Sequence, residues 1–146
     1  MGTNLGGGLL GPVFALAGWT GCVLLLIAFR RLRAGFRGDV HVRAFALGED
    51  ASVPLPARLA NRNYMNLLEL PVLFYVACLM ATMIGRGTPA MVGLAWLYVA
   101  LRMAHSLVHV TYNHVMHRFA VFAVSNGVLV LMWVLLGLQV FGRAGA

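Results

Sequence analysis

The 146-residue chain is 61% hydrophobic and only 10% charged, with a mean hydropathy of +0.85. Such values lie outside the range of soluble globular domains and predict a protein whose main solvent is lipid. The formal net charge of +7 arises from arginine, because the chain contains no lysine. In a soluble domain this charge would suggest a nucleic-acid partner. Here most arginines gather at the ends of apolar stretches, so no nucleic-acid partner is expected.

Four apolar stretches follow along the chain, each close to the roughly 20 residues that a helix needs to cross a bilayer. We expect spans at about residues 9–29, 60–84, 90–112 and 118–141, with a loop at about 30–59. No other segment is long enough for a second domain, so residues 1–146 are predicted to form a single all-α domain, a four-transmembrane-helix bundle. Pro71 predicts a kink in the second span. Cys22 and Cys78 lie inside spans and are expected to be free thiols.

The arginines are distributed unevenly between the two sides that four spans define. Arg86 and Arg143 fall on one side, whereas the other side holds Arg30, Arg31, Arg33, Arg37, Arg43, Arg58, Arg62 and Arg118. Cytoplasmic loops carry the excess of basic residues in membrane proteins. The distribution therefore predicts that both termini lie outside and that the arginine-rich loop lies in the cytoplasm.

The second span carries three polar residues on one helical face. Arg62, Asn66 and Glu69 are spaced four and three residues apart, which aligns them over two turns. Glu69 is the only acidic residue in any predicted span. Ionisable groups at bilayer depth are energetically unfavourable and usually have a partner or a function. This face is therefore a candidate functional site.

The third span carries a second polar stripe. Arg102, His105, Ser106 and His109 stand at positions i, i+3, i+4 and i+7 of an otherwise apolar helix. The second and third spans run in opposite directions, so Arg102 is expected at a depth similar to that of Glu69. The two polar stripes can therefore face each other.

A basic pocket opening to the cytoplasm is predicted where the stripes approach the span ends. Arg118 begins the fourth span on this side, and Arg30 and Arg31 end the first span there. One interpretation is structural: an ion pair of Glu69 with Arg102, helped by polar neighbours, holds the helices together. Another is that the pocket binds an anionic, partly water-soluble ligand, because arginine holds carboxylates bidentately.

The histidines suggest a third interpretation. His105, His109, His114 and His117 stand close together in the sequence, and two histidines at i and i+4 can share a metal ion. A histidine run of this kind also resembles intramembrane haem ligation. Arg102 beside the run would repel a metal cation. We therefore assign no metal ligands, and a haem- or metal-binding membrane protein remains an alternative.

Three sequence features together resemble a known family. The segment from Arg62 to Glu69 has the pattern R-x-x-x-N-x-x-E, and Arg102 is followed by His105 and by His109 four residues further on. Arg118 follows nine residues after His109. This arrangement resembles that of the MAPEG family, the membrane-associated proteins in eicosanoid and glutathione metabolism. The chain resembles a bacterial-type member of this family. The resemblance extends over all four predicted spans.

The resemblance implies a homotrimer of four-helix subunits in the inner membrane of a bacterium, with glutathione as co-substrate near the cytoplasmic face between adjacent subunits. Arg118 would be catalytic, because a cation beside the glutathione sulfur favours the thiolate. A lipophilic electrophile or hydroperoxide would arrive from the membrane lipid. The glutathione-binding positions would be Arg62, Asn66, Glu69, Arg102, His105, Ser106 and His109, with one of Arg30 and Arg31.

Among the positions that depart from the pattern of the family, two bear directly on the site. His109 stands where the family carries a tyrosine that contacts glutathione, and Phe119 stands where some members offer a hydroxyl beside the catalytic arginine. These departures leave an alternative to the transferase or peroxidase. The chain could be a non-enzymatic membrane subunit, or a ligand-binding protein, that keeps the MAPEG fold.

Overall fold

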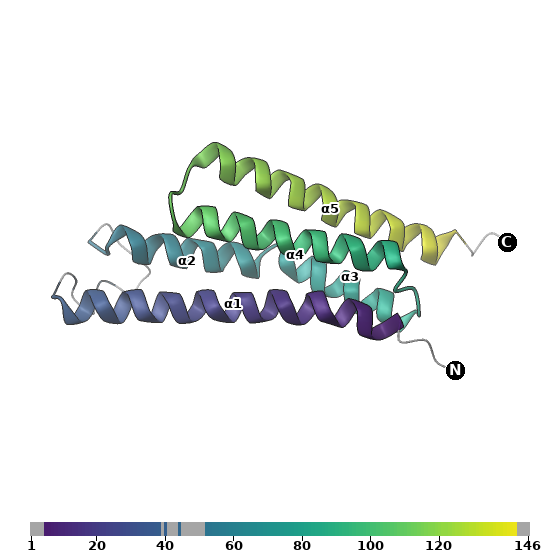
Figure 1. Ribbon diagram of the computed structural model, residues 1–146, viewed down its shortest axis with the longest axis horizontal. Helices are drawn as coiled ribbons and strands as arrows, with labels where there is room; N and C mark the ends of the chain where they lie inside the picture. Colours follow the sequence, from purple (N-terminus) through teal and green to yellow (C-terminus); the bar gives the residue numbers. More distant parts are fainter. Residues whose placement is uncertain (1–4, 39, 41–43, 45–51, 143–146) are drawn as a thin grey trace.

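The computed structural model describes residues 5–38, 40, 44 and 52–142. The described residues contain α-helices and no strand. The helices are α1 (Leu5–Phe36), α2 (Leu55–Leu68), α3 (Pro71–Met83), α4 (Pro89–Val110) and α5 (Val115–Phe141). They run roughly along one long axis, as Figure 1 shows.

The helices α2 and α3 together make one membrane span that is broken in the middle. The backbone leaves the helical region at Glu69, with φ −81° and ψ −97°, and α3 begins at Pro71. Proline lacks the N–H that would bond to the carbonyl of Leu67, and its ring clashes with that carbonyl. The kink predicted at Pro71 is thus confirmed as a complete break between two helices.

Four helical segments are long and apolar enough to cross a membrane: 8–36, 55–83, 89–110 and 115–141. The prediction of an all-α bundle with four transmembrane helices is confirmed, and the chain is an integral multi-pass membrane protein. Its outer surface is strongly apolar. Phe14, Leu25 and Phe141, for example, are all more than 70% exposed, as expected of side chains that face lipid.

The helices are longer than the predicted spans at one end of the bundle. α1 continues to Phe36, so Arg30 and Arg31 lie within it. α2 starts at Leu55 with Pro56 among its first residues, where proline is well tolerated. Arginine is also a good helix former, so the helices extend past the apolar stretches. Because the apolar stretches are shorter than the helices, the predicted end of the first helix and the predicted start of the second helix were several residues too close to the middle of the membrane.

The bundle has an arginine-rich end, where α1 ends, α2 begins, α4 ends and α5 begins. The start of α1 and the end of α5 lie at the opposite end (Figure 1). Between the ends, the core is built from side chains of all five helices, including Leu16, Leu67 and Met132. Phe74 of α3 stacks on Tyr98 of α4 with ring centroids 4.7 Å apart.

Candidate functional site at the arginine-rich end

The polar stripe of α4 points into the bundle. The exposed fractions of Arg102, His105, Ser106 and His109 are 0%, 3%, 0% and 2%. A helix that carries polar groups on one face only would place them away from lipid. The stripe therefore lies against α2 and α5. Of the predicted polar face of α2, only Asn66 meets it, through its backbone carbonyl.

The contacts between α2 and α4 differ in detail from the predicted pairing. Asn63 is fully buried and donates from Nδ2 to Ser106 Oγ at 2.5 Å. Asn63 is not among the predicted site residues, because it lies outside the helical face that holds Arg62 and Asn66. A signal was present, since an amide inside a membrane helix usually seeks a partner on another helix.

Arg102 is the most unusual residue of the stripe. Its Nη2 donates to the backbone carbonyl of Asn66, and its Cζ lies 6.0 Å and 5.6 Å from the ring centroids of Tyr98 and Phe122. Aromatic faces at these distances stabilise a cation. Within the described chain, Nε and Nη1 are buried and have no hydrogen-bond partner. A buried guanidinium with two unused donors is well suited to an anionic ligand.

Glu69 does not form the predicted pair with Arg102. No ion pair joins the two side chains among the described residues, and Glu69 is exposed. The four-and-three spacing aligns residues only where the helix is continuous, and Glu69 sits at the break before Pro71. The structural interpretation based on this ion pair is therefore wrong. Arg62 is likewise exposed, and only Asn66 of the predicted α2 face lies half-buried against α4.

Arg118 lies in the first turns of α5, where a side-chain contact holds it. Its Nη1 donates to Asn113 Oδ1 at 2.7 Å. Asn113 has φ 47° in the connection between α4 and α5, a left-handed conformation that asparagine tolerates better than most residues. The tight turn therefore both reverses the chain and fixes the catalytic candidate.

A cavity of about 240 Å³ opens beside Arg118. It is lined by Asn66, His105, Val115, Arg118, Phe119 and Phe122. The structure thus brings together one predicted residue from each of α2, α4 and α5. Phe122 lines this cavity, and its ring centroid lies 5.6 Å from Arg102 Cζ and 5.7 Å from the ring of His105.

His105 and His109 carry further unused polar atoms. Their ring centroids are 5.8 Å apart. In the part of the chain that the structure describes, Nδ1 of His105 and both ring nitrogens of His109 are buried without a partner. Buried polar groups in native proteins are nearly always bonded. A ligand, water or a second subunit is therefore expected to approach this region.

Arg30 contacts two other helices at the arginine-rich end. Its Nη1 donates to the Pro56 carbonyl at 2.7 Å, and its Nη2 donates to the Val110 carbonyl at 3.3 Å. Its guanidinium therefore links the start of α2 to the end of α4. A cation at the end of α4 also interacts favourably with the helix dipole. Neither Arg30 nor Arg31 lines the cavity beside Arg118.

His114 and His117 do not line the cavity. His114 and His117 are exposed and pack with ring centroids 4.4 Å apart, and Tyr112 Oη lies 3.3 Å from His117 Nδ1. Over residues 5–38, 40, 44 and 52–142, no group of three or more His, Cys, Asp or Glu side chains could hold a metal ion.

Comparison with known proteins gives one match. Searches of curated proteins and of solved structures found none. The family model described as MAPEG family matches residues 9–138, which include every residue of the α2, α4 and α5 site described above. Because this match covers most of the 146 residues, the chain belongs to the MAPEG family.

Proposed function

We propose that the chain is a glutathione-dependent transferase or peroxidase that acts on a lipophilic electrophile or hydroperoxide. One observation carries the proposal: Arg118, held by Asn113, lines a cavity together with Asn66 and His105. Membership of the MAPEG family supports glutathione as the thiol.

The charges around the cavity suit glutathione, which carries two carboxylates and one ammonium group. Arg102 offers two unused buried N–H groups, and Arg118 keeps donors beyond the one that bonds to Asn113. Arginine is the side chain best matched to carboxylates. The cavity would hold the cysteinyl part, and one charged end would extend toward the exposed Arg62. In a homotrimer, a neighbouring subunit would cover that end.

The proposed role of Arg118 is to stabilise the glutathione thiolate. An ordinary thiol has a pKa of about 8.5, and a nearby guanidinium lowers it, so that more thiolate is present at neutral pH. The thiolate sulfur then forms a bond to an electrophilic carbon. In a substitution, the displaced group leaves with the bonding electron pair. In a conjugate addition to an unsaturated carbonyl compound, the carbon next to the carbonyl takes up a proton.

A hydroperoxide would react at the same sulfur. The thiolate attacks one oxygen, the O–O bond breaks, and the alkoxide leaves and takes up a proton to become an alcohol. The sulfur is then a sulfenic acid, which a second glutathione converts to the disulfide with release of water. His105, with a buried unused Nδ1 in the described chain, is positioned to hydrogen-bond glutathione during either reaction.

The proposal is tested by glutathione binding to the detergent-purified protein. Calorimetry reports binding, and ultraviolet absorbance reports the thiolate. We expect both signals with the unmodified protein and loss of the thiolate signal with Arg118→Ala. Arg86→Ala, at the opposite end of the bundle, is the matched control and should behave as the unmodified protein. A thiolate signal and turnover that survive in Arg118→Ala would remove the mechanism.

A second candidate function is a non-enzymatic membrane subunit or ligand-binding protein of the same fold. Phe119 supports it, because a phenyl ring lines the cavity where a hydroxyl would assist catalysis. Co-purification with a larger complex in stoichiometric amount would favour this candidate. Isolation of a free trimer that turns over glutathione would argue against it.

A further inference from the structure

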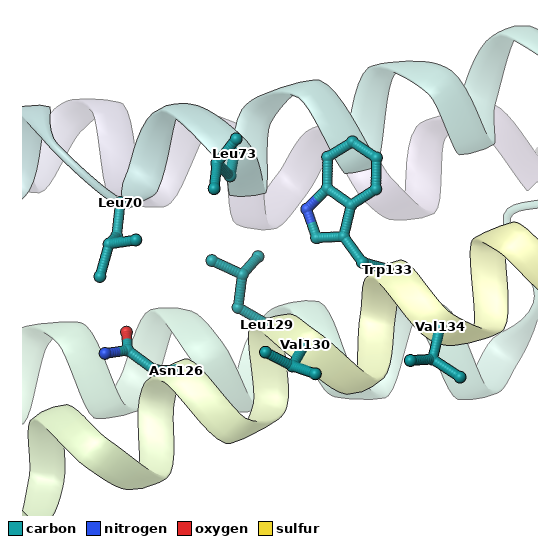
Figure 2. Close-up of a pocket in the computed structure, with 7 residues that line it drawn as sticks. All are labelled: Leu70, Leu73, Asn126, Leu129, Val130, Trp133 and Val134. Atoms are coloured by element: carbon teal, nitrogen blue, oxygen red, sulfur yellow. The ribbon is translucent and has the colours of Figure 1, made fainter.

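Besides the cavity at Arg118, the described residues form an apolar cavity of about 440 Å³ between α3 and α5, shown in Figure 2. Its polar atoms Asn126 Oδ1 and Trp133 Nε1 are buried within the protein, so they are closed to a ligand in this cavity. The open part of the lining is aliphatic, such as Val130, which is 61% exposed. Aliphatic surface is expected wherever a membrane protein meets lipid chains, so this cavity identifies no ligand.

A charged cleft lies at the arginine-rich end, where α1 ends and α2 begins (Figure 1). It measures about 300 Å³, and we call it the α1–α2 cleft. Ala34 of α1 and Ala57 of α2 line it and are buried. Because each of these side chains is a single methyl group, the two helices leave room between them. Arginines and one phenylalanine complete the α1 side of the cleft: Phe29, Arg30, Arg33 and Arg37.

The three arginines of the cleft stand at positions i, i+3 and i+7, which places them on one face of α1. Arg30 donates to the carbonyls of Pro56 and Val110. Arg33 and Arg37 are exposed, and within residues 5–38, 40, 44 and 52–142 neither guanidinium forms a hydrogen bond or an ion pair. In the described chain no acidic residue lines the cleft. Like charges one turn apart repel each other, so an anion between them would be stabilised.

The cleft changes from apolar to charged along α1. Phe29 is 59% exposed and lies nearer the middle of the bundle, whereas Arg37 directly follows the last residue of α1. From Phe29 to Arg37 the helix axis advances by about 12 Å. The head-group region on each side of a bilayer is about 5–7 Å thick. A ligand that fills the cleft would therefore contact both hydrocarbon and the head-group region, as an amphiphile does.

We propose that the α1–α2 cleft binds an anionic phospholipid, with the phosphate between Arg33 and Arg37 and an acyl chain along Phe29. Guanidinium groups hold phosphate oxygens through paired hydrogen bonds. Basic pockets at the cytoplasmic ends of membrane helices are typical sites for anionic head groups. A zwitterionic lipid brings a cation with its phosphate, and the arginines would repel that cation. The cleft should therefore select lipids by net charge, and neither the family match nor the proposed function assigns it this ligand.

The test measures, by native mass spectrometry of the detergent-purified protein, the affinities for phosphatidylglycerol and for phosphatidylcholine with the same acyl chains. We expect the unmodified protein to prefer phosphatidylglycerol. Arg33→Gln and Arg37→Gln should each weaken phosphatidylglycerol binding about fivefold, the effect of one arginine near an anionic lipid surface, and leave phosphatidylcholine binding unchanged. Arg58→Gln, on α2 at the same end but outside the cleft lining, is the matched control and should change neither affinity.

Two results would overturn this selectivity. Equal binding of the two lipids by the unmodified protein would show that the cleft does not recognise the anionic head group. An equal loss in Arg58→Gln and in the two cleft variants would show a general attraction to the arginines of this end. Thermal unfolding establishes that each variant is folded, which is expected because Arg33 and Arg37 are exposed.

The acyl chain has its own test. Phe29→Ala should weaken phosphatidylglycerol binding, because Phe29 is the exposed apolar residue of the cleft on α1. Glycerophosphoglycerol, which is the head group without acyl chains, should not displace the lipid at an equal concentration. Displacement by this soluble head group, with no effect of Phe29→Ala, would assign the cleft to a water-soluble anion and overturn the proposal.

Two competing anions remain to be distinguished from a lipid. Glutathione at millimolar concentration should not displace phosphatidylglycerol, and displacement would make the cleft a part of the thiol site. The connection between α1 and α2 contains Asp39, Glu49 and Asp50. A preference for phosphatidylglycerol that emerges only in Glu49→Gln combined with Asp50→Asn would assign the cleft to this connection. Either result would overturn the lipid proposal and leave the thiolate test with Arg118→Ala unaffected.

Discussion

Arg102 is a buried cation whose nearest interactions are a backbone carbonyl and two aromatic rings. Removing one partner of a buried ion pair usually destabilises a protein by about 3–5 kcal/mol, because the other charge is left uncompensated. Arg102 forms no ion pair in the described chain, and Glu69 attracts it only from a longer distance. Its two unused N–H donors therefore suit an anionic ligand.

Arg102→Leu is expected to separate ligand binding from stability. Glutathione affinity should fall at least about tenfold, as a lost charge-assisted hydrogen bond contributes about 1.5–3 kcal/mol. The free energy of unfolding should change by less than about 1.5 kcal/mol. Calorimetry and denaturant unfolding in detergent measure the two quantities. Unchanged affinity together with a large loss of stability would show that Arg102 is structural, and Arg86→Ala, at the opposite end of the bundle, is the control.

The hydrogen bond between Asn63 and Ser106 is expected to be structural. Ser106→Ala removes the acceptor and leaves Nδ2 of a fully buried asparagine unpaired. Hydrogen bonds between membrane helices are worth about 0.6–1.7 kcal/mol, so the free energy of unfolding should fall by roughly 1 kcal/mol. A double-mutant cycle with Asn63→Ala measures the coupling. A coupling near zero would contradict the assignment.

At the scale of the elements, Arg30 joins three helices at the arginine-rich end. It lies on α1 and donates to the carbonyls of Pro56 on α2 and Val110 on α4. Arg33, one turn later, is exposed and provides a matched control on the same helix. The two arginines therefore distinguish a structural role from a general effect of positive charge.

Arg30→Ala should destabilise the protein by about 1–2 kcal/mol, because two carbonyls lose a charged donor. Arg33→Ala should stay within about 0.5 kcal/mol of the unmodified protein, as most exposed substitutions do. Glutathione affinity should fall much less in Arg30→Ala than in Arg102→Leu. A selective loss of glutathione binding in Arg30→Ala, without loss of stability, would instead return Arg30 to the binding site.

The sequence predicted the elements better than their ends and their partners. A 3.6-residue period is a local property, so the buried stripe of α4 and its orientation toward α2 were predictable. The position of Glu69 was not, because the break before Pro71 interrupts the spacing on which its alignment depended. The Asn113 contact that holds Arg118 arises from a left-handed turn, which no periodic pattern signals.

At the scale of the whole molecule, the proposed chemistry depends on orientation in the membrane. The cavity beside Arg118 lies at the arginine-rich end, and the positive-inside rule predicts that this end faces the cytoplasm. Cytoplasm is also where a water-soluble thiol is kept reduced. The predicted orientation and the supply of reduced thiol therefore both require the cavity to open to the cytoplasm.

Two variants that each add one cysteine to a Cys22→Ser background, in which the remaining Cys78 is buried, test this orientation. Phe36→Cys lies at the arginine-rich end of α1, where Phe36 is 88% exposed, and Arg86→Cys lies in the connection between α3 and α4. A membrane-impermeant maleimide should label Arg86→Cys in intact cells and Phe36→Cys only after permeabilisation. Arg86→Cys removes an arginine from the end that has few arginines. The difference in positive charge between the two ends therefore increases, and the substitution itself does not favour the reverse orientation. The reverse labelling would place the cavity outside the cell. That result would contradict the orientation predicted from the arginines and would separate the site from reduced glutathione.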